Sequence, residues 1–128
     1  MMAMEKTRKE LISEVLNDLS KSVPDIEFST LVSADGIIIT STNSEKIKSE
    51  RAGAIIAALA SVNENATKDL MNERLQYAYA VGKNGYIVLS INDNGEVLSA
   101  VVKNSEQIDK VFNNMRMANE KIANNNGC

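Results

Sequence analysis

The stretch LQYAYAVGKNGYIVLSINDNGEVLSAVV, residues 75–102, decides the fold class. It contains three runs rich in β-branched, aromatic and other apolar residues, at 75–81, 86–91 and 96–102, and each polar segment between them carries Asn-Gly. Asn-Gly is favoured in tight hairpin turns because both residues accept a positive φ. The stretch therefore predicts three consecutive antiparallel strands. In the first strand, alternation places Leu75, Tyr77, Tyr79 and Val81 on one side.

A second hairpin is predicted upstream, between residues 26 and 42. Two β-rich runs, FSTLVS at 28–33 and IIITST at 37–42, flank Ala34-Asp35-Gly36. Asp-Gly between two such runs is a strong hairpin signal, since glycine accepts the backbone conformation that the turn needs.

Two amphipathic helices are predicted at the ends of the chain. Thr7 and Glu10 form a capping box ahead of an apolar stripe, and Pro24 ends that helix because the residue before proline is pushed out of the helical region. Asn104 and Gln107 have the same spacing ahead of a second stripe, which runs to residue 122.

The central helix, predicted at residues 49–70, has an unusual composition. Its segment AGAIIAALA, residues 52–60, has no polar side chain. A helix that is apolar around its whole circumference is buried on more than one side. The larger residues predict one face, and the small residues around Gly53, Ala57 and Ala60 predict another that permits close backbone approach. The order of elements is therefore α-β-β-α-β-β-β-α, in one domain at residues 1–124 with a short polar tail at 125–128.

Composition excludes several classes of function. The net charge of −3 and the 4% aromatic content argue against a nucleic-acid binder. The chain lacks histidine, and its single cysteine is residue 128, so Ser-His and Cys-His nucleophiles and an internal disulfide are ruled out. No apolar run is long enough to cross a bilayer and no signal peptide is recognisable, so a cytoplasmic protein without membrane insertion is expected.

Catalytic, metal and cofactor sites are not predicted. The segment Gly82-Lys83-Asn84-Gly85 lies between two strands, whereas a phosphate-binding loop needs a helix after it. Asp35 and Asp93 fall in turns, where a short carboxylate usually bonds to the local backbone. The run around Asp93 is too short for a calcium loop. The chain is therefore expected not to be an enzyme.

The sequence resembles the Roadblock/LC7 family from about residue 5 to residue 122. The resemblance rests on LVSADGIII at 31–39, on the alanine-rich helix, on GKNGYIVL at 82–89 and on GEVL at 95–98. It implies a profilin-like α+β fold, in which a five-stranded antiparallel sheet carries the central helix on one face and the terminal helices on the other. It also implies dimers, formed by edge-to-edge pairing of the third strands and side-by-side packing of the central helices. Family members serve as GTPase regulators, including activators, as dynein light chains, and as scaffolds.

A homodimer contact follows from this resemblance and from the central helix. One sheet covers only one side of that helix, and a second copy would cover the other. The strand at 75–81 has neither proline nor charge, so nothing protects its edge from pairing with another chain. The residues expected at the contact are Ala52, Gly53, Ala54, Ile56, Ala57, Ala60, Ser61, Gln76, Tyr77, Ala78, Tyr79, Ala80 and Val81. Arg51 and Arg74 flank the helix and are the candidates for contact with another partner.

The function expected from these features is a non-enzymatic homodimeric adaptor that binds and regulates or scaffolds a small Ras-like GTPase. The alternative is a small-molecule sensor, or a generic dimerisation module, of profilin-like or PAS-like architecture. A sensor usually needs a cavity with convergent polar groups, and the inward positions here are mostly Ile, Val, Leu and Ala.

Overall fold

The computed structural model describes residues 6–103 and 108–124. The predicted order of elements is confirmed, with one short 3-10 helix added. The elements are α1 (Arg8–Ser22), β1 (Ile26–Val32), β2 (Ile38–Ser41), η1 (Ser44–Lys46), α2 (Ala52–Met71), β3 (Ala78–Val81), β4 (Gly85–Ile91), β5 (Val97–Lys103) and α3 (Ile108–Asn124).

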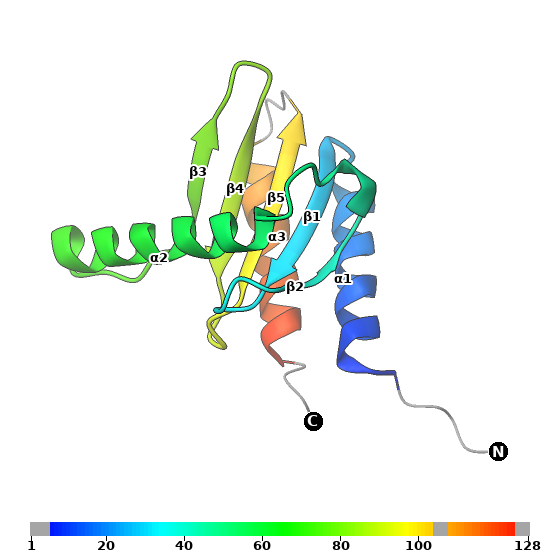
Figure 1. The fold of residues 1–128 in the computed structure, drawn as a ribbon, viewed down its shortest axis with the longest axis horizontal. Helices are drawn as coiled ribbons and strands as arrows, with labels where there is room; N and C mark the ends of the chain where they lie inside the picture. The colour runs from blue at the N-terminus through cyan, green and yellow to red at the C-terminus, as the bar shows by residue number, and fades with distance from the viewer. Residues whose placement is uncertain (1–5, 104–107, 125–128) are drawn as a thin grey trace.

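The five strands form one antiparallel sheet in the order β2-β1-β5-β4-β3 (Figure 1). The central strand is β5, and it pairs with β1, which lies far from it in the sequence, from Ile26↔Val102 to Val32↔Val97. β3 lies at one edge and β2 at the other, so each has a strand on one side only.

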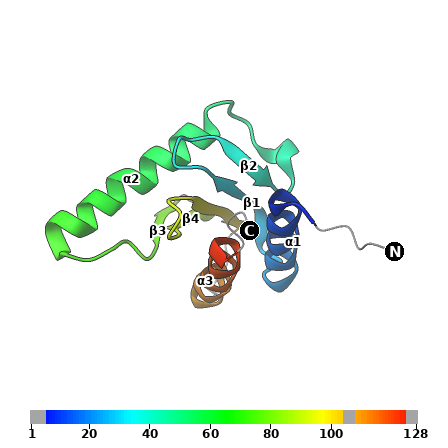
Figure 2. The same cartoon turned by 90° about the horizontal axis from the view of Figure 1, so that it is seen from below.

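The helices are divided between the two faces of the sheet. Figure 2 shows α2 on one face and α1 with α3 on the other, as the family resemblance implies. Each interface has its own apolar core. The core under α1 and α3 consists of Ile12, Leu16, Leu19, Val23, Ile26, Leu31, Tyr86, Val88, Leu98, Ala100, Val102, Val111, Met115, Ala118 and Ile122. The smaller core under α2 consists of Val32, Ala60, Leu75, Leu89 and Val97.

The turn and cap residues act as local chemistry predicts. The Thr7 hydroxyl accepts a hydrogen bond from the Glu10 amide at 3.2 Å and caps α1, which ends before Pro24. Gly36 closes the β1–β2 turn with φ +86°, a conformation that side chains other than glycine rarely adopt. The predicted cap at Asn104 and Gln107 and the polar tail at 125–128 lie outside the described residues.

Two predicted boundaries were wrong by three residues. α2 begins at Ala52 rather than at Ser49, whose hydroxyl accepts a hydrogen bond from the Arg51 amide. β3 begins at Ala78 rather than at Leu75. The Leu75 amide donates to the Glu64 carboxylate of α2 at 2.9 Å, and the Leu75 side chain enters the core under α2. Residues 75–77 therefore lie outside the sheet, although the sequence pattern predicts that they belong to the strand.

Candidate functional site

The face of α2 toward the sheet is made largely of small residues. Gly53 and Ala60 are buried, while Ile56 and Ala57 are partly buried against the core under α2. A Cβ at Gly53 would lie 2.3 Å from the carbonyl oxygen of Gly36, so only glycine permits this approach of the helix to the β1–β2 turn. The small-residue face is thus used within the protomer.

Two of the expected contact residues on α2, Gly53 and Ala60, are buried within the protomer. Gly53 and Ala60 cannot reach a partner because they are buried against their own sheet. Ala54 and Ser61 are exposed, and Ala52 is half-buried beside them. The dimer contact stays a prediction, and the exposed side of α2 that is available to it carries Ile55, Leu59 and Val62 as well as Ala54 and Ser61.

The outer face of α2 is apolar and open. Ile55 is 47% exposed, Leu59 40% and Val62 66%, and these three residues recur at helical spacing on one side. Leu70 and Met71, at the end of the helix, are also exposed apolar residues. Figure 1 shows that the C-terminal half of α2 projects past β3, beyond the sheet of its own protomer.

A row of apolar residues on the same face of the sheet is left uncovered by α2. Phe28, Val101, Ile87 and Ala80 are register partners across β1, β5, β4 and β3. Strand alternation places Ile87 and Val101 on the same face as Leu89 and Val97, which α2 covers. Ala80 and Ile87 are exposed, and Phe28 and Val101 are half-buried. We call this row the bare strip.

β3 provides an open strand edge next to these two surfaces. Its exposed residues are Tyr79, Ala80 and Val81, with Ala78 half-buried, and the exposed Gln76 lies just before the strand. No charged residue or proline interrupts residues 75–82. Edges of this kind pair readily with another strand.

Tyr77 is held within the protomer instead. Its ring stacks on Phe112 of α3 at a centroid distance of 4.7 Å, and its hydroxyl donates to the Phe112 carbonyl at 3.0 Å. Burial raises the pKa of the Tyr77 hydroxyl above its ordinary value. Tyr79 also contacts Phe112, at 5.8 Å, but remains more than half exposed. Leu75 faces α2 and both tyrosines face α3, so the predicted alternation holds only from Tyr77 onward.

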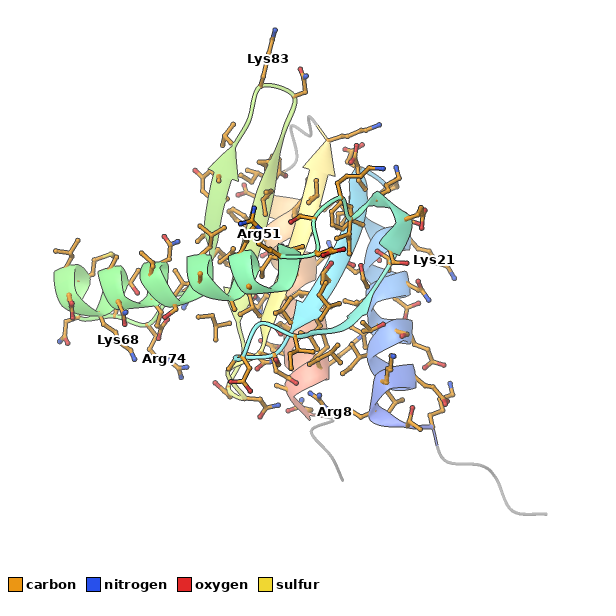
Figure 3. All side chains as sticks on the ribbon, viewed as in Figure 1. Arg8, Lys21, Arg51, Lys68, Arg74 and Lys83 are labelled. Carbon is orange, nitrogen blue, oxygen red and sulfur yellow. The ribbon has the colours of Figure 1, made fainter. Side chains whose placement is uncertain are left out.

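Arg51 and Arg74 lie at opposite ends of α2 and are not brought together (Figure 3). Arg51 immediately precedes the helix and is exposed. Arg74 is held loosely, 3.9 Å from the Glu64 carboxylate and 3.6 Å from the Asp93 carboxylate. Each arginine can meet a partner, but the two do not form a single anion site.

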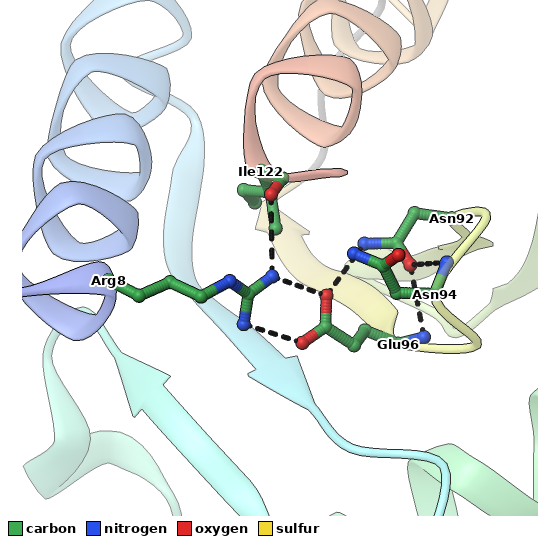
Figure 4. Close-up of polar contacts among 5 residues, drawn as sticks. All are labelled: Arg8, Asn92, Asn94, Glu96 and Ile122. Atoms are coloured by element: carbon green, nitrogen blue, oxygen red, sulfur yellow. Dashed lines mark hydrogen bonds and ion pairs between the residues drawn. The ribbon is translucent and has the colours of Figure 1, made fainter. Parts of the chain in front are cut away.

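Sequence spacing gave no sign of a part-buried ion pair between Arg8 and Glu96 (Figure 4). The Arg8 guanidinium donates to both carboxylate oxygens of Glu96 at 2.8 Å and to the Ile122 carbonyl at 3.3 Å. The Asn92 amide donates to the same carboxylate at 3.0 Å. The network joins the start of α1, the β4–β5 turn and the end of α3. Such bidentate pairs are the stronger kind of charge-assisted hydrogen bond.

The pKa of Glu96 is the net result of opposing effects. Burial alone raises it, but the hydrogen bonds from Arg8 and Asn92, together with the Arg8 charge, outweigh burial and hold the pKa below its ordinary value of 4.5. Because the folded-state pKa is the lower one, the network stabilises the fold fully above about pH 4.5 and loses this effect as the pH falls through the folded-state pKa.

Replacing Arg8 by alanine is expected to lower the free energy of unfolding by about 2 kcal/mol at pH 7, because it leaves the Glu96 carboxylate part-buried without its cation. Replacing Glu96 by glutamine should reduce the loss of stability between pH 5 and pH 3. Urea unfolding at several pH values measures both effects. Lys103→Ala is the control, since its 3.3 Å pair with Glu27 is more exposed and is expected to contribute less than 1 kcal/mol. An equal decrease in the free energy of unfolding for Arg8→Ala and Lys103→Ala would contradict a special role for the part-buried network.

The two carboxylates considered as a catalytic pair are not brought together. Asp35 and Asp93 lie exposed in separate turns, as expected. Within residues 6–103 and 108–124, no three acidic, histidine or cysteine residues are grouped as a metal site. In the same part of the chain, no helix is both long and apolar enough to span a bilayer.

Comparison with known proteins agrees with the fold. The Roadblock/LC7 domain matches residues 12–104. Myxococcus xanthus MglB superposes with a TM-score of 0.82 at 16% identity, over 96% of this chain and 92% of that one. A structure described as MglB with a tetrameric arrangement superposes with a TM-score of 0.80 at 16% identity, over 97% of this chain and 93% of that one. LokiProfilin1, from its complex with rabbit actin, superposes with a TM-score of 0.57 at 18% identity, over 96% of this chain and 98% of that one. Comparison with curated protein sequences finds no match. Since the domain match covers most of the chain and the fold agrees, the chain belongs to the Roadblock/LC7 family.

Proposed function

We propose that this protein is a homodimeric adaptor that binds a small Ras-like GTPase and regulates or scaffolds it, without catalysis of its own. The observation that carries the proposal is the presence of three exposed apolar features on one protomer: the outer face of α2, the bare strip and the open edge of β3. Soluble monomers rarely leave so large an apolar surface in water.

The positions of these three features fit a two-fold axis that passes through the edge of β3. Antiparallel pairing of β3 with its copy would satisfy both strand edges and extend the sheet across the dimer. Within one protomer, α2 crosses the sheet near Ala78, at the start of β3. The bare strip, which includes Ala80 and its partner Ile87, is left uncovered. A rotation about the centre of β3 therefore brings the projecting half of the partner's α2 over the bare strip.

The same rotation places the two α2 helices side by side and antiparallel. Ile55, Leu59 and Val62 then lie between them, with Val62 close to the middle of the helix. Burying a side chain of this size stabilises an association by about 1.5 kcal/mol or more, against the cost of immobilising two molecules. The tetrameric arrangement described for an MglB structure is consistent with a chain of this fold that associates with itself.

The GTPase link rests on membership of the Roadblock/LC7 family. A nucleotide would then belong to the partner, and the one Gly- and Lys-containing turn among the described residues does not suit a phosphate. The segment Gly82-Lys83-Asn84-Gly85 runs directly into β4 and presents no helix N-terminus to a phosphate. The purified protein is therefore expected to show no heat of binding with GTP, GDP or ATP in titration calorimetry. Micromolar binding of any of the three would assign the nucleotide to this chain instead of to a partner.

The partner can be identified from native cytosol with the immobilised protein, followed by mass spectrometry of the retained proteins. The expected result is a small GTPase, whose binding as a purified protein differs between its GDP and GTP-analogue forms. Arg51→Ala should weaken that binding, while Lys21→Ala on α1, at the opposite face of the sheet, should not. A dimer that retains no GTPase under either nucleotide condition would overturn the GTPase link and leave the dimer intact.

A further inference from the structure

A polar cleft lies beside the segment that precedes β3. Its volume is about 480 Å³, and it opens between the 74–77 segment, the end of β4 and the C-terminal half of α3. Tyr77, Ser90, Ile91, Arg116 and Asn119 are among the residues that line it. α3 covers the face of the sheet opposite to α2, so the cleft is separate from the outer face of α2 and from the bare strip.

The first feature that points to a ligand is an unpaired stretch of sheet edge. β3 pairs with β4 only from Ala78↔Leu89 to Val81↔Tyr86, while β4 continues to Ile91. The Gly82 amide donates to the Gly85 carbonyl at 2.8 Å. Since hydrogen-bonded and non-hydrogen-bonded pairs alternate in an antiparallel pair of strands, this bond shows which residues of β4 direct their N–H and C=O toward β3. By that alternation, the N–H and C=O of Ile91 point outward, toward the position that Gln76 would fill. Within the described residues, no hydrogen bond joins these two groups to residue 76 or to any other residue.

The second feature is a buried polar pair at the floor of the cleft. Asn119 of α3 is 6% exposed, and its side-chain amide donates to the Ser90 hydroxyl at 2.7 Å. The carbonyl oxygen of the same side chain has no hydrogen-bond partner among the described residues. Turning the amide over would leave its nitrogen unpaired instead, so one polar group stays unsatisfied in either orientation. Buried groups of this kind are uncommon and costly in a folded protein.

The third feature is the charge at the rim. Arg116 lies 3.5 Å from the Glu120 carboxylate, and Arg74 lies 3.6 Å from the Asp93 carboxylate. These contacts are long compared with the distance of about 2.8 Å that a guanidinium makes to a well-placed carboxylate. An incoming carboxylate can therefore replace them with shorter bonds.

We propose that this cleft binds a short extended peptide segment of a partner protein that carries an acidic residue. The backbone of the peptide pairs with Ile91 and takes the place that a longer β3 would occupy. One peptide amide group meets the unsatisfied side chain of Asn119, and the acidic side chain binds Arg116 and Arg74. Addition of a strand to an open sheet edge is a general mode of peptide recognition.

A random heptapeptide library displayed on phage, selected on the immobilised full chain, provides the probe. The recovered peptides are expected to contain Asp or Glu, and their synthetic copies should bind with a micromolar Kd in fluorescence anisotropy. Amide resonances of Ser90, Ile91 and Asn119 should shift on binding. N-methylation of the peptide should weaken binding about tenfold only at the positions whose N–H bonds to Ile91 or to Asn119.

Arg116→Gln, a surface change that leaves the core intact, should weaken binding of the acidic peptides about tenfold. Asn119→Leu should do the same, while Met117→Gln, next to Arg116 but outside the cleft lining, should have no effect. The Val62→Glu variant should bind the peptides as the wild type does, which separates this site from the proposed dimer. The proposal is overturned if no peptide is enriched, if enriched peptides bind Arg116→Gln and the wild type equally, or if the shifted resonances lie on α2.

Discussion

Replacing Val62 by glutamate is expected to convert the protein from a homodimer into a folded monomer. Val62 is 66% exposed in the protomer, so the carboxylate is solvated when the chain is alone. In the proposed dimer, two such carboxylates would face each other between antiparallel α2 helices. Burying them without cations costs several kcal/mol, which is enough to raise the dimer dissociation constant by more than a hundredfold. Sedimentation equilibrium should change from twice 14.0 kDa to 14.0 kDa.

Met117→Glu is the matched control for this experiment. Met117 is an exposed apolar residue of similar kind, 51% exposed, but it lies on α3 at the opposite face of the sheet. The variant should remain dimeric and should melt as the wild type does. A wild-type chain that sediments as a monomer at micromolar concentration would refute the dimer. A dimeric Val62→Glu variant would show that the contact does not involve the outer face of α2.

The alternation of strands and turns was readable from the sequence because it depends on local chemistry. Asp35-Gly36 and the Asn-Gly segments fix where the chain reverses, and β-rich runs between them leave little choice of element. The sheet order, in contrast, joins β1 to β5 across most of the chain. Local patterns do not specify that pairing. The family resemblance implied a five-stranded antiparallel sheet, but the order of its strands comes from the structure.

The faces of α2 could not be assigned from the sequence for a physical reason. An amphipathic helix shows which side is buried, but residues 52–60 are apolar on every side. The choice depends on the backbone approach of Gly53 to Gly36, a tertiary contact between residues seventeen positions apart. The structure places Gly53, Ala57 and Ala60 toward the sheet, together with Ile56, and leaves Ile55, Leu59 and Val62 exposed beside Ala54 and Ser61.

Side-chain alternation failed at Leu75 for a similar reason. Leu75 and Tyr77 would share a face in a continuous strand, but Glu64 of α2 binds the Leu75 amide and draws the chain away from β4. The cleft beside Asn119 exists because of that departure. Neither this cleft nor the Arg8–Glu96 pair has a signal in residue spacing, since each joins elements from distant parts of the chain.

Replacing Gly53 by alanine is expected to lower the free energy of unfolding by about 3 kcal/mol, because it inserts a methyl group where the helix and the β1–β2 turn are already in contact. The added Cβ would lie 2.3 Å from the Gly36 carbonyl oxygen and 3.2 Å from Ile38. The carbonyl belongs to the backbone and cannot rotate away as a side chain would, so α2 must move off the sheet.

The sign of this effect distinguishes packing from helix propensity. Alanine is the better helix former by about 1 kcal/mol, so propensity alone predicts that Gly53→Ala stabilises the protein. Gly82→Ala is the control, since its Cβ would meet only the Gly85 carbonyl at an ordinary 3.6 Å. Urea unfolding at one fixed protein concentration should show a lower midpoint for Gly53→Ala with an unchanged slope, and little change for Gly82→Ala. A Gly53→Ala variant as stable as the wild type would mean that α2 can shift along the sheet, and that the close approach does not determine which face of the helix is exposed.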